Sequence, residues 1–261
     1  MKGKIYTMKK LFHEIEDNIK RIREEISAAA AAGRSESEIR LMAVTKTVEP
    51  ERINRAIDCG IDLIGENRVQ ELLAKLPALE AGGNELSPGA EGRGIKPRAH
   101  IEKHLIGHLQ TNKVSRVIGA VDMIQSVDSL RLAAEISKQA VKLGTNMEVL
   151  IEVNIGRETS KSGLLPEALA ENLHEISEMR NIIIRGLMAI PPICEKNSEI
   201  RAFFYDMRKL FIDIQGKKMD NIKMSILSMG MSGDYKEAIL EGSTMIRVGS
   251  SIFGYRKEEE K

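Results

Sequence analysis

Two turns rich in glycine and serine, Ser228–Asp234 and Gly249–Ser251, form the strongest candidate for an anion site in this sequence. Glycine lets backbone N–H groups approach an anion closely, and serine hydroxyls add further donors. A helix expected to begin near Tyr235 would direct the positive end of its dipole toward the same place. These features are typical of a phosphate site. The alternative is that glycine serves only the positive φ angles that tight turns require.

Lys46 is the second candidate, because it ends the short apolar run Leu41–Thr45. A lysine at the end of such a strand is partly desolvated, which lowers the pKa of its amine and lets the amine condense with an aldehyde. The alternative is an ordinary surface or ion-paired lysine. Together with a phosphate anchor across the site, a reactive amine suits a phosphorylated aldehyde as ligand.

Arg247 lies two residues before Gly249, so the two residues share a face of a strand with a period of two. A guanidinium on the inner face needs an anionic or acceptor partner, because burying an unpaired charge is costly. That partner is either a ligand or a structural carboxylate such as Glu66 or Glu152.

His104, His108 and Lys161 are weaker candidates. The two histidines are four residues apart, with no third ligand and no HExxH frame, so we expect packing or a ligand contact and no metal site. Lys161 lies in a predicted loop, where a lysine is usually solvated, but it could also contact an aldehyde or a phosphate. The two cysteines, Cys59 and Cys194, lack the spacing of a zinc site or a disulfide framework.

The elements that must position these residues alternate regularly between strand and helix. After an amphipathic helix over Leu11–Ala32, the apolar patterns predict eight strands separated by helices. Such alternation implies a parallel sheet, and eight units in about 250 residues favour a closed (β/α)8 TIM barrel of the α/β class. The rival is an open doubly wound sheet, but no GxGxxG follows the first strand. The predicted strands are Leu41–Thr45, Ile61–Gly65, Ile101–Ile106, Val121–Ser126, Glu148–Val153, Ile182–Ala189, Lys223–Leu227 and Thr244–Val248. The helices between them are predicted over Val48–Cys59, Arg68–Leu76, Thr111–Ile118, Ser129–Leu143, Pro166–Met179, Ser198–Gln215 and Tyr235–Glu241.

Length and composition favour one soluble domain over residues 1–261. The 39 Lys and Arg residues nearly balance the 38 Asp and Glu residues, so the net charge of +1 offers nothing to attract nucleic acid. The N-terminus lacks the apolar core of a signal peptide, and no apolar run is long enough to span a membrane, so we expect a cytoplasmic protein. The segment Ala81–Arg98 is rich in glycine and lacks periodicity, which indicates a flexible insertion loop.

Several sequence blocks resemble those of the YggS/PROSC family of pyridoxal-phosphate homeostasis proteins, which is related to the N-terminal barrel of alanine racemase. The resemblance extends along nearly the whole chain, apart from the segment 81–98. It is carried by AVTKTVEPERI (43–53), GENRVQE (65–71), HLIGHLQTNK (104–113), SVDS (126–129), VNIGRETSKSG (153–163), RGLMAIPP (185–192), LSMGMSGDYKEAI (227–239) and RVGSSIFGYR (247–256).

The resemblance implies a role in binding pyridoxal 5'-phosphate (PLP) for individual residues. Lys46 matches the lysine that forms an aldimine with PLP, and Asn67 matches a residue beside the ring. Arg247 matches an arginine facing the pyridine nitrogen, where a charged donor keeps that nitrogen unprotonated. Lys161 matches a lysine suspected of holding PLP in a second mode. Ser232, Gly249 and Ser250 match the phosphate cradle, and Met229, Gly233 and His104 complete the expected cofactor contacts.

The resemblance favours a protein that stores, buffers or delivers PLP over an enzyme. A related racemase uses a second, β-rich domain and a tyrosine acid, and we expect no such domain here, which would leave PLP exposed to water. The alternatives are a PLP-dependent amino-acid racemase, for which Tyr235 is the nearest candidate acid, and a Schiff-base aldolase acting on a sugar phosphate. We expect PLP-dependent apo-enzymes as recipients, and a monomer.

Overall fold

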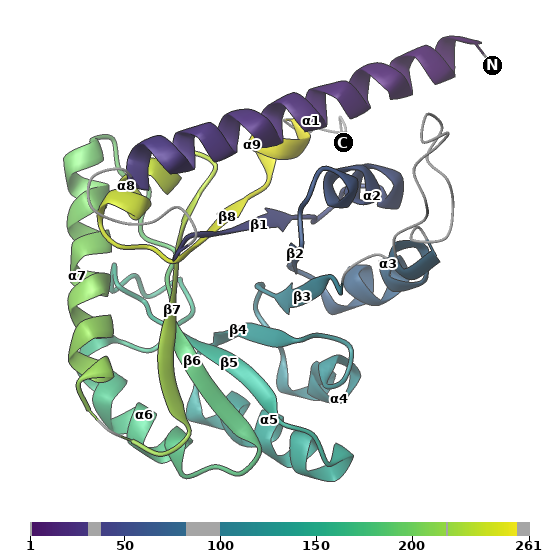
Figure 1. Ribbon diagram of the computed structural model, residues 1–261. Helices are drawn as coiled ribbons and strands as arrows, with labels where there is room; N and C mark the ends of the chain where they lie inside the picture. The colour runs from purple at the N-terminus through teal and green to yellow at the C-terminus, as the bar shows by residue number, and fades with distance from the viewer. Residues whose placement is uncertain (1, 31–37, 82–99, 218, 255–261) are drawn as a thin grey trace.

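Eight parallel strands form the centre of the computed structural model, which describes residues 2–30, 38–81, 100–217 and 219–254. The strands close into a barrel in sequence order, with β8 paired to β1 (Figure 1). The predicted α/β fold, a (β/α)8 barrel preceded by an extra helix, is therefore confirmed. The strand bounds are β1 Arg40–Val44, β2 Leu63–Glu66, β3 Glu102–Leu105, β4 Met123–Val127, β5 Met147–Glu152, β6 Ile182–Met188, β7 Ile222–Met231 and β8 Met245–Val248.

Helices surround the barrel and cover the outer faces of the strands (Figure 1). A leading helix, α1 (Lys2–Ala30), packs across α2, α8 and α9 and so joins the first and last units of the barrel. The other bounds are α2 Pro50–Asp58, α3 Val69–Ala81, η2 Thr111–Lys113, α4 Val114–Val117, α5 Leu130–Leu143, η3 Pro166–Ala168, α6 Leu169–Ser177, α7 Asn197–Gln215, α8 Tyr235–Leu240 and α9 Ser250–Phe253.

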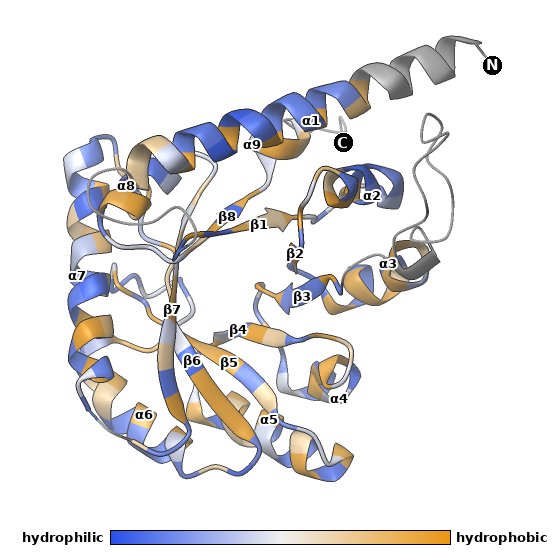
Figure 2. Cartoon of the chain, viewed as in Figure 1, coloured by the Kyte–Doolittle hydropathy of each residue, from blue (hydrophilic) through white to orange (hydrophobic). Residues whose placement is uncertain are grey.

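The inner face of α1 is apolar at helical spacing. Ile15, Ile19, Ile22 and Ile26 are all buried, and they pack in one hydrophobic cluster with residues of β1, β8 and the neighbouring helices. Along α1, hydrophobic and hydrophilic segments alternate, as the amphipathic pattern requires (Figure 2). The helix is thus part of the hydrophobic core that lies outside the barrel, between the strands and the helices.

Replacing Ile22 by alanine is expected to lower the free energy of unfolding by about 2–5 kcal/mol, because Ile22 is fully buried and the lost methyl groups leave a cavity. Lys20→Ala, on the exposed side of the same helix, serves as the control. Urea denaturation of both variants checks the prediction. Equal stability of the two variants would mean that α1 contributes little to the core.

A second, smaller core fills the inside of the barrel. Met42, Val44, Leu63, Ile106 and Met245 form one apolar cluster there, and a second one consists of Met123, Leu150 and Met188. Ala43, between the two inward-facing residues of β1, belongs instead to the cluster outside the barrel that contains the isoleucines of α1. This alternation places Lys46, two residues after Val44, on the inner side at the carboxyl end of β1.

Most elements differ from their predicted bounds by a few residues, and α1 begins at Lys2 instead of Leu11. Three further differences affect the core or the carboxyl ends of the strands. α3 continues through Pro77 to Ala81, because Leu79 packs in the outer core and this contact outweighs the hydrogen bond that proline removes. β7 extends to Met231, so most of the first glycine- and serine-rich turn belongs to a strand. A short helix, α9, follows β8, where no helix was predicted.

Two further expectations concern the insertion loop and membrane-spanning helices. The predicted insertion loop, residues 81–98, lies outside the described residues except for Ala81, which ends α3. In the described part of the chain, every helix is too short or too polar to cross a membrane.

Candidate functional site

The carboxyl ends of the strands and the loops that follow them form one end of the barrel, which we call the mouth. Lys46 lies in the turn after β1, Asn67 directly follows β2, and the loops after β7 and β8 carry Ser232, Gly233, Gly249 and Ser250. In barrels of this type the chemistry takes place at this end. The structure therefore brings most of the predicted site residues to the expected end of the fold.

The two turns rich in glycine and serine meet at the hydroxyl of Ser232. Its Oγ accepts hydrogen bonds from the backbone N–H of Gly249, at 3.2 Å, and of Ser251, at 3.4 Å. The hydroxyl of Ser251 donates in turn to the carbonyl oxygen of Ser232, at 3.4 Å. Two backbone donors thus converge on one oxygen, an arrangement that would also suit an oxygen of an anion.

Lys46 lies beside this pair of turns. β1 and β8 are paired in register from Arg40 to Ala43, so the turn after β1 and the turn after β8 leave the barrel side by side. At Gly249 a Cβ atom would come within 3.4 Å of the Val44 carbonyl oxygen, which shows how closely the two turns approach. An amine and a set of anion donors therefore share one edge of the mouth.

Arg247 is buried inside the barrel just below the mouth, with only 3% of its surface exposed. It donates to Ser228 Oγ at 2.7 Å and to the Ala189 carbonyl oxygen at 2.9 Å. Burial lowers the pKa of the guanidinium to about 10, against the opposing effect of the Asp234 and Glu152 carboxylates, so Arg247 is charged at neutral pH. Its hydrogen bonds go to neutral oxygens, and the suggested structural pair with Glu66 is wrong.

A chain of hydrogen bonds continues from Arg247 through the barrel. Ser228 Oγ donates to Gln125 Oε1, and Gln125 Nε2 faces His104 Nδ1, both at 2.8 Å. His104 Nε2 lies 2.6 Å from Glu102 Oε1, and Arg40 donates to the other oxygen of that carboxylate. These two partners hold the pKa of Glu102 at about 2. His104 therefore lies deep in the barrel, where it supports Arg247 through Gln125.

Met229 and Tyr235 do not face the mouth. The side chain of Met229 is fully buried in a second hydrophobic cluster outside the barrel, which includes Phe204 and Leu227, because Met229 belongs to the extended β7. Tyr235, suggested as an acid near the mouth, instead donates its hydroxyl to Glu25 of α1. Burial and this carboxylate raise the pKa of Tyr235. The placement of Tyr235 at the mouth was therefore wrong, since its side chain faces the outer layer of helices.

Lys161 lies in the loop after β5, next to the loop after β6. Its ammonium is 2.5 Å from a carboxylate oxygen of Glu158 and donates to the Pro191 carbonyl oxygen at 3.4 Å. The ion pair with Glu158 therefore engages the Lys161 ammonium. In this conformation Lys161 ties two loops together.

Acidic residues that were not predicted as site residues also lie near the mouth. Glu152 ends β5, and burial, with the nearby Asp128 carboxylate, raises its pKa to about 7. Asp128 follows β4 and pairs with His108 at 3.0 Å. In the sequence, Asp128 was marked only by its position after a strand, and Glu152, at the end of a strand, was considered only as a structural partner of Arg247. Gln125, a polar residue within an apolar strand, carried a similar signal.

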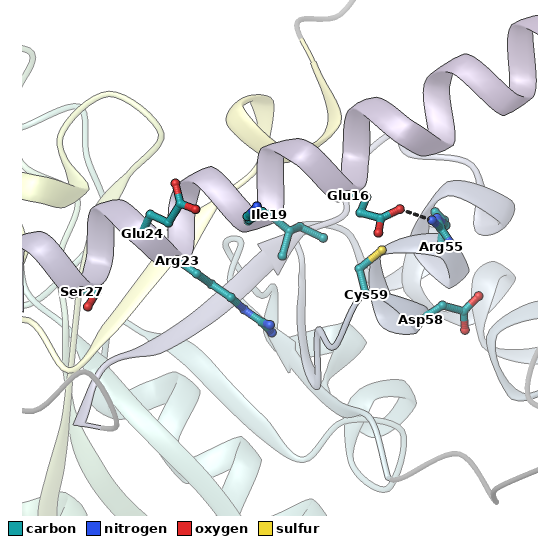
Figure 3. A pocket seen from close by; sticks show the side chains of 9 residues that line it. Glu16, Ile19, Arg23, Glu24, Ser27, Arg55, Asp58 and Cys59 are labelled. Carbon is teal, nitrogen blue, oxygen red and sulfur yellow. Dashed lines mark hydrogen bonds and ion pairs between the residues drawn. The ribbon is translucent and has the colours of Figure 1, made fainter.

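A groove lies on the outside of the barrel, between α1 and α2 (Figure 3). Charged side chains line most of it, and Arg55 of α2 pairs with Glu16 of α1 at 2.5 Å. Cys59, at the end of α2, also lines the groove, and burial raises the pKa of its thiol. None of the candidate residues at the mouth lines this groove, so we regard it as separate from the candidate site.

Comparison with known proteins places the chain in a family. The family model of the alanine racemase N-terminal domain matches residues 13–257. A pyridoxal phosphate homeostasis protein of Aquifex aeolicus is 40% identical over 242 residues, which are 92% of this chain and 98% of the relative. The structure of PipY of Synechococcus elongatus with PLP bound has a TM-score of 0.75 at 30% identity and covers 92% of this chain and 100% of PipY. A protein of Bifidobacterium adolescentis described as unknown has a TM-score of 0.85 at 40% identity, over 93% of this chain and 96% of that chain. The chain therefore belongs to the family of pyridoxal phosphate homeostasis proteins, within the alanine racemase N-terminal domain family.

Proposed function

We propose that this protein binds PLP at the mouth of its barrel and stores, buffers or delivers it within the cell. Membership of the family supports this function, and PipY, a relative with the same fold, has been solved with PLP bound. The observation in this chain that carries the proposal is the convergence of two backbone N–H groups on Ser232, beside Lys46. An aldehyde that also bears a phosphate needs both features.

The hydroxyls of Ser232 and Ser250 and the backbone N–H of Ser250 would hold the phosphate, while the N–H groups of Gly249 and Ser251 orient the Ser232 hydroxyl by donating to it. Ser232 already accepts two backbone hydrogen bonds, so its own O–H can be donated to an anion. This would fix the aldehyde near the turn that carries Lys46, which raises the effective concentration of the amine.

Lys46 would hold the aldehyde covalently. Its uncharged amine attacks the aldehyde carbon, a C=N double bond replaces the C=O double bond, and the carbonyl oxygen leaves as water. Asn67, in the loop directly after β2, would line the ring. The charged guanidinium of Arg247 would donate to the pyridine nitrogen and keep that nitrogen unprotonated. PLP serves enzymes as an electron sink, and an unprotonated ring is a weaker one.

We further propose that the bound PLP is carried and not used in catalysis. The relatives are named as homeostasis proteins. Tyr235, the tyrosine considered for a racemase, is bound to Glu25 on the outer side of the barrel and cannot reach the mouth from there. The weakened electron sink expected from Arg247 favours the same conclusion. Recipient apo-enzymes, an intracellular location and a monomeric state belong to this proposal as expectations.

The absorption spectrum of the purified protein tests the binding proposal. We expect a yellow protein, or a colourless one that turns yellow with added PLP. Borohydride reduction should then fix a pyridoxyl group that peptide mass spectrometry assigns to Lys46. A protein that stays colourless with PLP would contradict the proposal, and cleavage of phosphorylated sugars by such a protein would favour the aldolase alternative. Exchange of the α-hydrogen of D- or L-alanine with deuterated water would favour a racemase over a carrier.

A further inference from the structure

A compact ionic cluster lies directly behind Lys46, on the outer side of β1 and β2. The ammonium of Lys75, on α3, donates to Glu66 Oε1 and to Glu71 Oε1, each at 2.6 Å. Glu66 ends β2, and Glu71 lies one helical turn before Lys75. Lys75 and Glu66 are buried, with 8% and 1% of their surfaces exposed. The cluster is therefore separated from the mouth by the strands themselves.

The cluster contacts the backbone on both sides of Lys46. The Lys75 ammonium donates to the carbonyl oxygen of Thr45 at 2.7 Å, and the Thr45 hydroxyl donates to Glu66 Oε1 at 2.8 Å. On the other side, the backbone N–H of Thr47 donates to Glu71 Oε1. The residues before and after Lys46 are thus tied to the same three side chains.

Thr47 has a backbone conformation that needs such support. Its φ is 59°, in the left-handed region that β-branched residues rarely adopt. In this conformation the N–H of Thr47 donates to Glu71, so the carboxylate stabilises a backbone conformation that a β-branched residue by itself disfavours. This turn directs the chain away from β1 immediately after Lys46.

From these contacts we propose that Glu66, Lys75 and Glu71 are positioning residues that hold Lys46 in place for reaction with an aldehyde. The inference rests on the proposed function and assigns a role to residues that touch no ligand. Stability alone is a weak explanation for the cluster, since buried ion pairs often contribute little compared with apolar residues of similar size. In addition, Glu66 Oε2 is buried and makes no hydrogen bond within the described structure. Its other oxygen accepts hydrogen bonds from both Lys75 and Thr45. This is expected if the cluster serves to fix the backbone around Lys46.

The test compares two ligands that differ only at the reacting carbon. Pyridoxine 5'-phosphate carries an alcohol where PLP carries an aldehyde, so it can occupy the phosphate cradle without reacting with Lys46. We expect Lys75→Met and Glu71→Ala to slow covalent capture of PLP by about 10- to 100-fold, the range expected when a reacting group is displaced by up to about 1 Å. Binding of pyridoxine 5'-phosphate should stay within about twofold of the unaltered protein.

Two further variants serve as controls. Lys138→Met removes the lysine of an exposed ion pair with Glu135 on α5, and it should leave both ligands unaffected. Glu71→Gln keeps an oxygen that can accept from Thr47, so it should recover most of the capture rate lost in Glu71→Ala. Because 21% of the Glu71 side chain is exposed, the Glu71 variants should fold even if Lys75→Met does not.

The outcomes separate this inference from the proposed function. Unchanged capture rates in folded Lys75→Met and Glu71→Ala would overturn the positioning role. Equal losses for PLP and pyridoxine 5'-phosphate would also overturn it, because they would indicate a general structural effect on the site. If the unaltered protein binds neither compound, the proposed function itself fails. Hydrogen exchange at residues 45–48 should increase in the variants and provides a readout without ligand.

Discussion

Lys46→Ala is expected to abolish the yellow absorbance and the borohydride-stable label, since Lys161, the other lysine considered for PLP, is ion-paired with Glu158. Lys46 is exposed in a turn, so the substitution should change the free energy of unfolding by no more than about 0.5 kcal/mol. The phosphate cradle remains, and pyridoxine 5'-phosphate should bind as it does to the unaltered protein. Absorbance titration and mass spectrometry measure these effects.

Lys161→Ala is the matched control for Lys46→Ala. It removes a lysine of the loop after β5, which is paired with Glu158, and it should leave the covalent label in place. If Lys46→Ala still forms the covalent bond, the assignment of Lys46 is wrong. If the label shifts to Lys161 in that variant, Lys161 provides the second mode of binding that the family resemblance implies.

Arg247→Met is expected to lower the free energy of unfolding by about 3 kcal/mol, because it removes charge-assisted hydrogen bonds to two buried oxygens. Ser228 and the Ala189 carbonyl would be left without this donor. The affinity for PLP should also fall, since the proposed contact to the pyridine nitrogen is lost. Chemical denaturation and absorbance titration measure the two effects.

The loss in Arg247→Met should depend on pH through Glu152. Its pKa is already raised to about 7 by burial, and Arg247 opposes this rise. Without Arg247 the pKa of Glu152 in the folded protein rises further, so the folded state holds this proton to higher pH than the unfolded state does. The stability that this proton contributes is fully present below the pKa of Glu152 in the unfolded protein. It is lost as the pH rises through the pKa of Glu152 in the folded protein. The destabilisation should therefore be greater at pH 8 than at pH 5.

A destabilisation of Arg247→Met that is equal at both pH values would argue against the coupling to Glu152. Arg131→Met, which alters an exposed arginine at the start of α5, is the control and should have little effect at either pH. Arg247→Lys keeps a charge but offers fewer donors in a different geometry. Arg247→Lys should therefore recover the pH dependence of the unaltered protein more fully than its free energy of unfolding. The coupling to Glu152 needs only a positive charge, whereas the hydrogen bonds to Ser228 and Ala189 need the geometry of the guanidinium.

The barrel and the position of its active end were predictable from local patterns. Short apolar strands alternating with amphipathic helices leave few other arrangements, and parallel strands place all their carboxyl ends at one edge. For the same reason, Lys46 and the two turns rich in glycine and serine could be assigned to one end before their contacts were known. The isoleucines of α1 likewise show their helical spacing directly in the sequence.

The partners of individual polar side chains were not predictable in this way. The sequence pattern did not indicate that β7 continues to Met231, which directs the Met229 side chain outward into the hydrophobic core. It also did not indicate that α1 crosses α8, where Tyr235 donates to Glu25. His104 could be assigned to a strand but not to the interior chain that leads to Arg247. The ionic cluster behind Lys46 joins residues up to 30 positions apart. Periodicity records which face of an element is apolar, because burial acts on every residue of that face. A single hydrogen bond depends on how two distant elements pack, and that information appears only once the barrel closes.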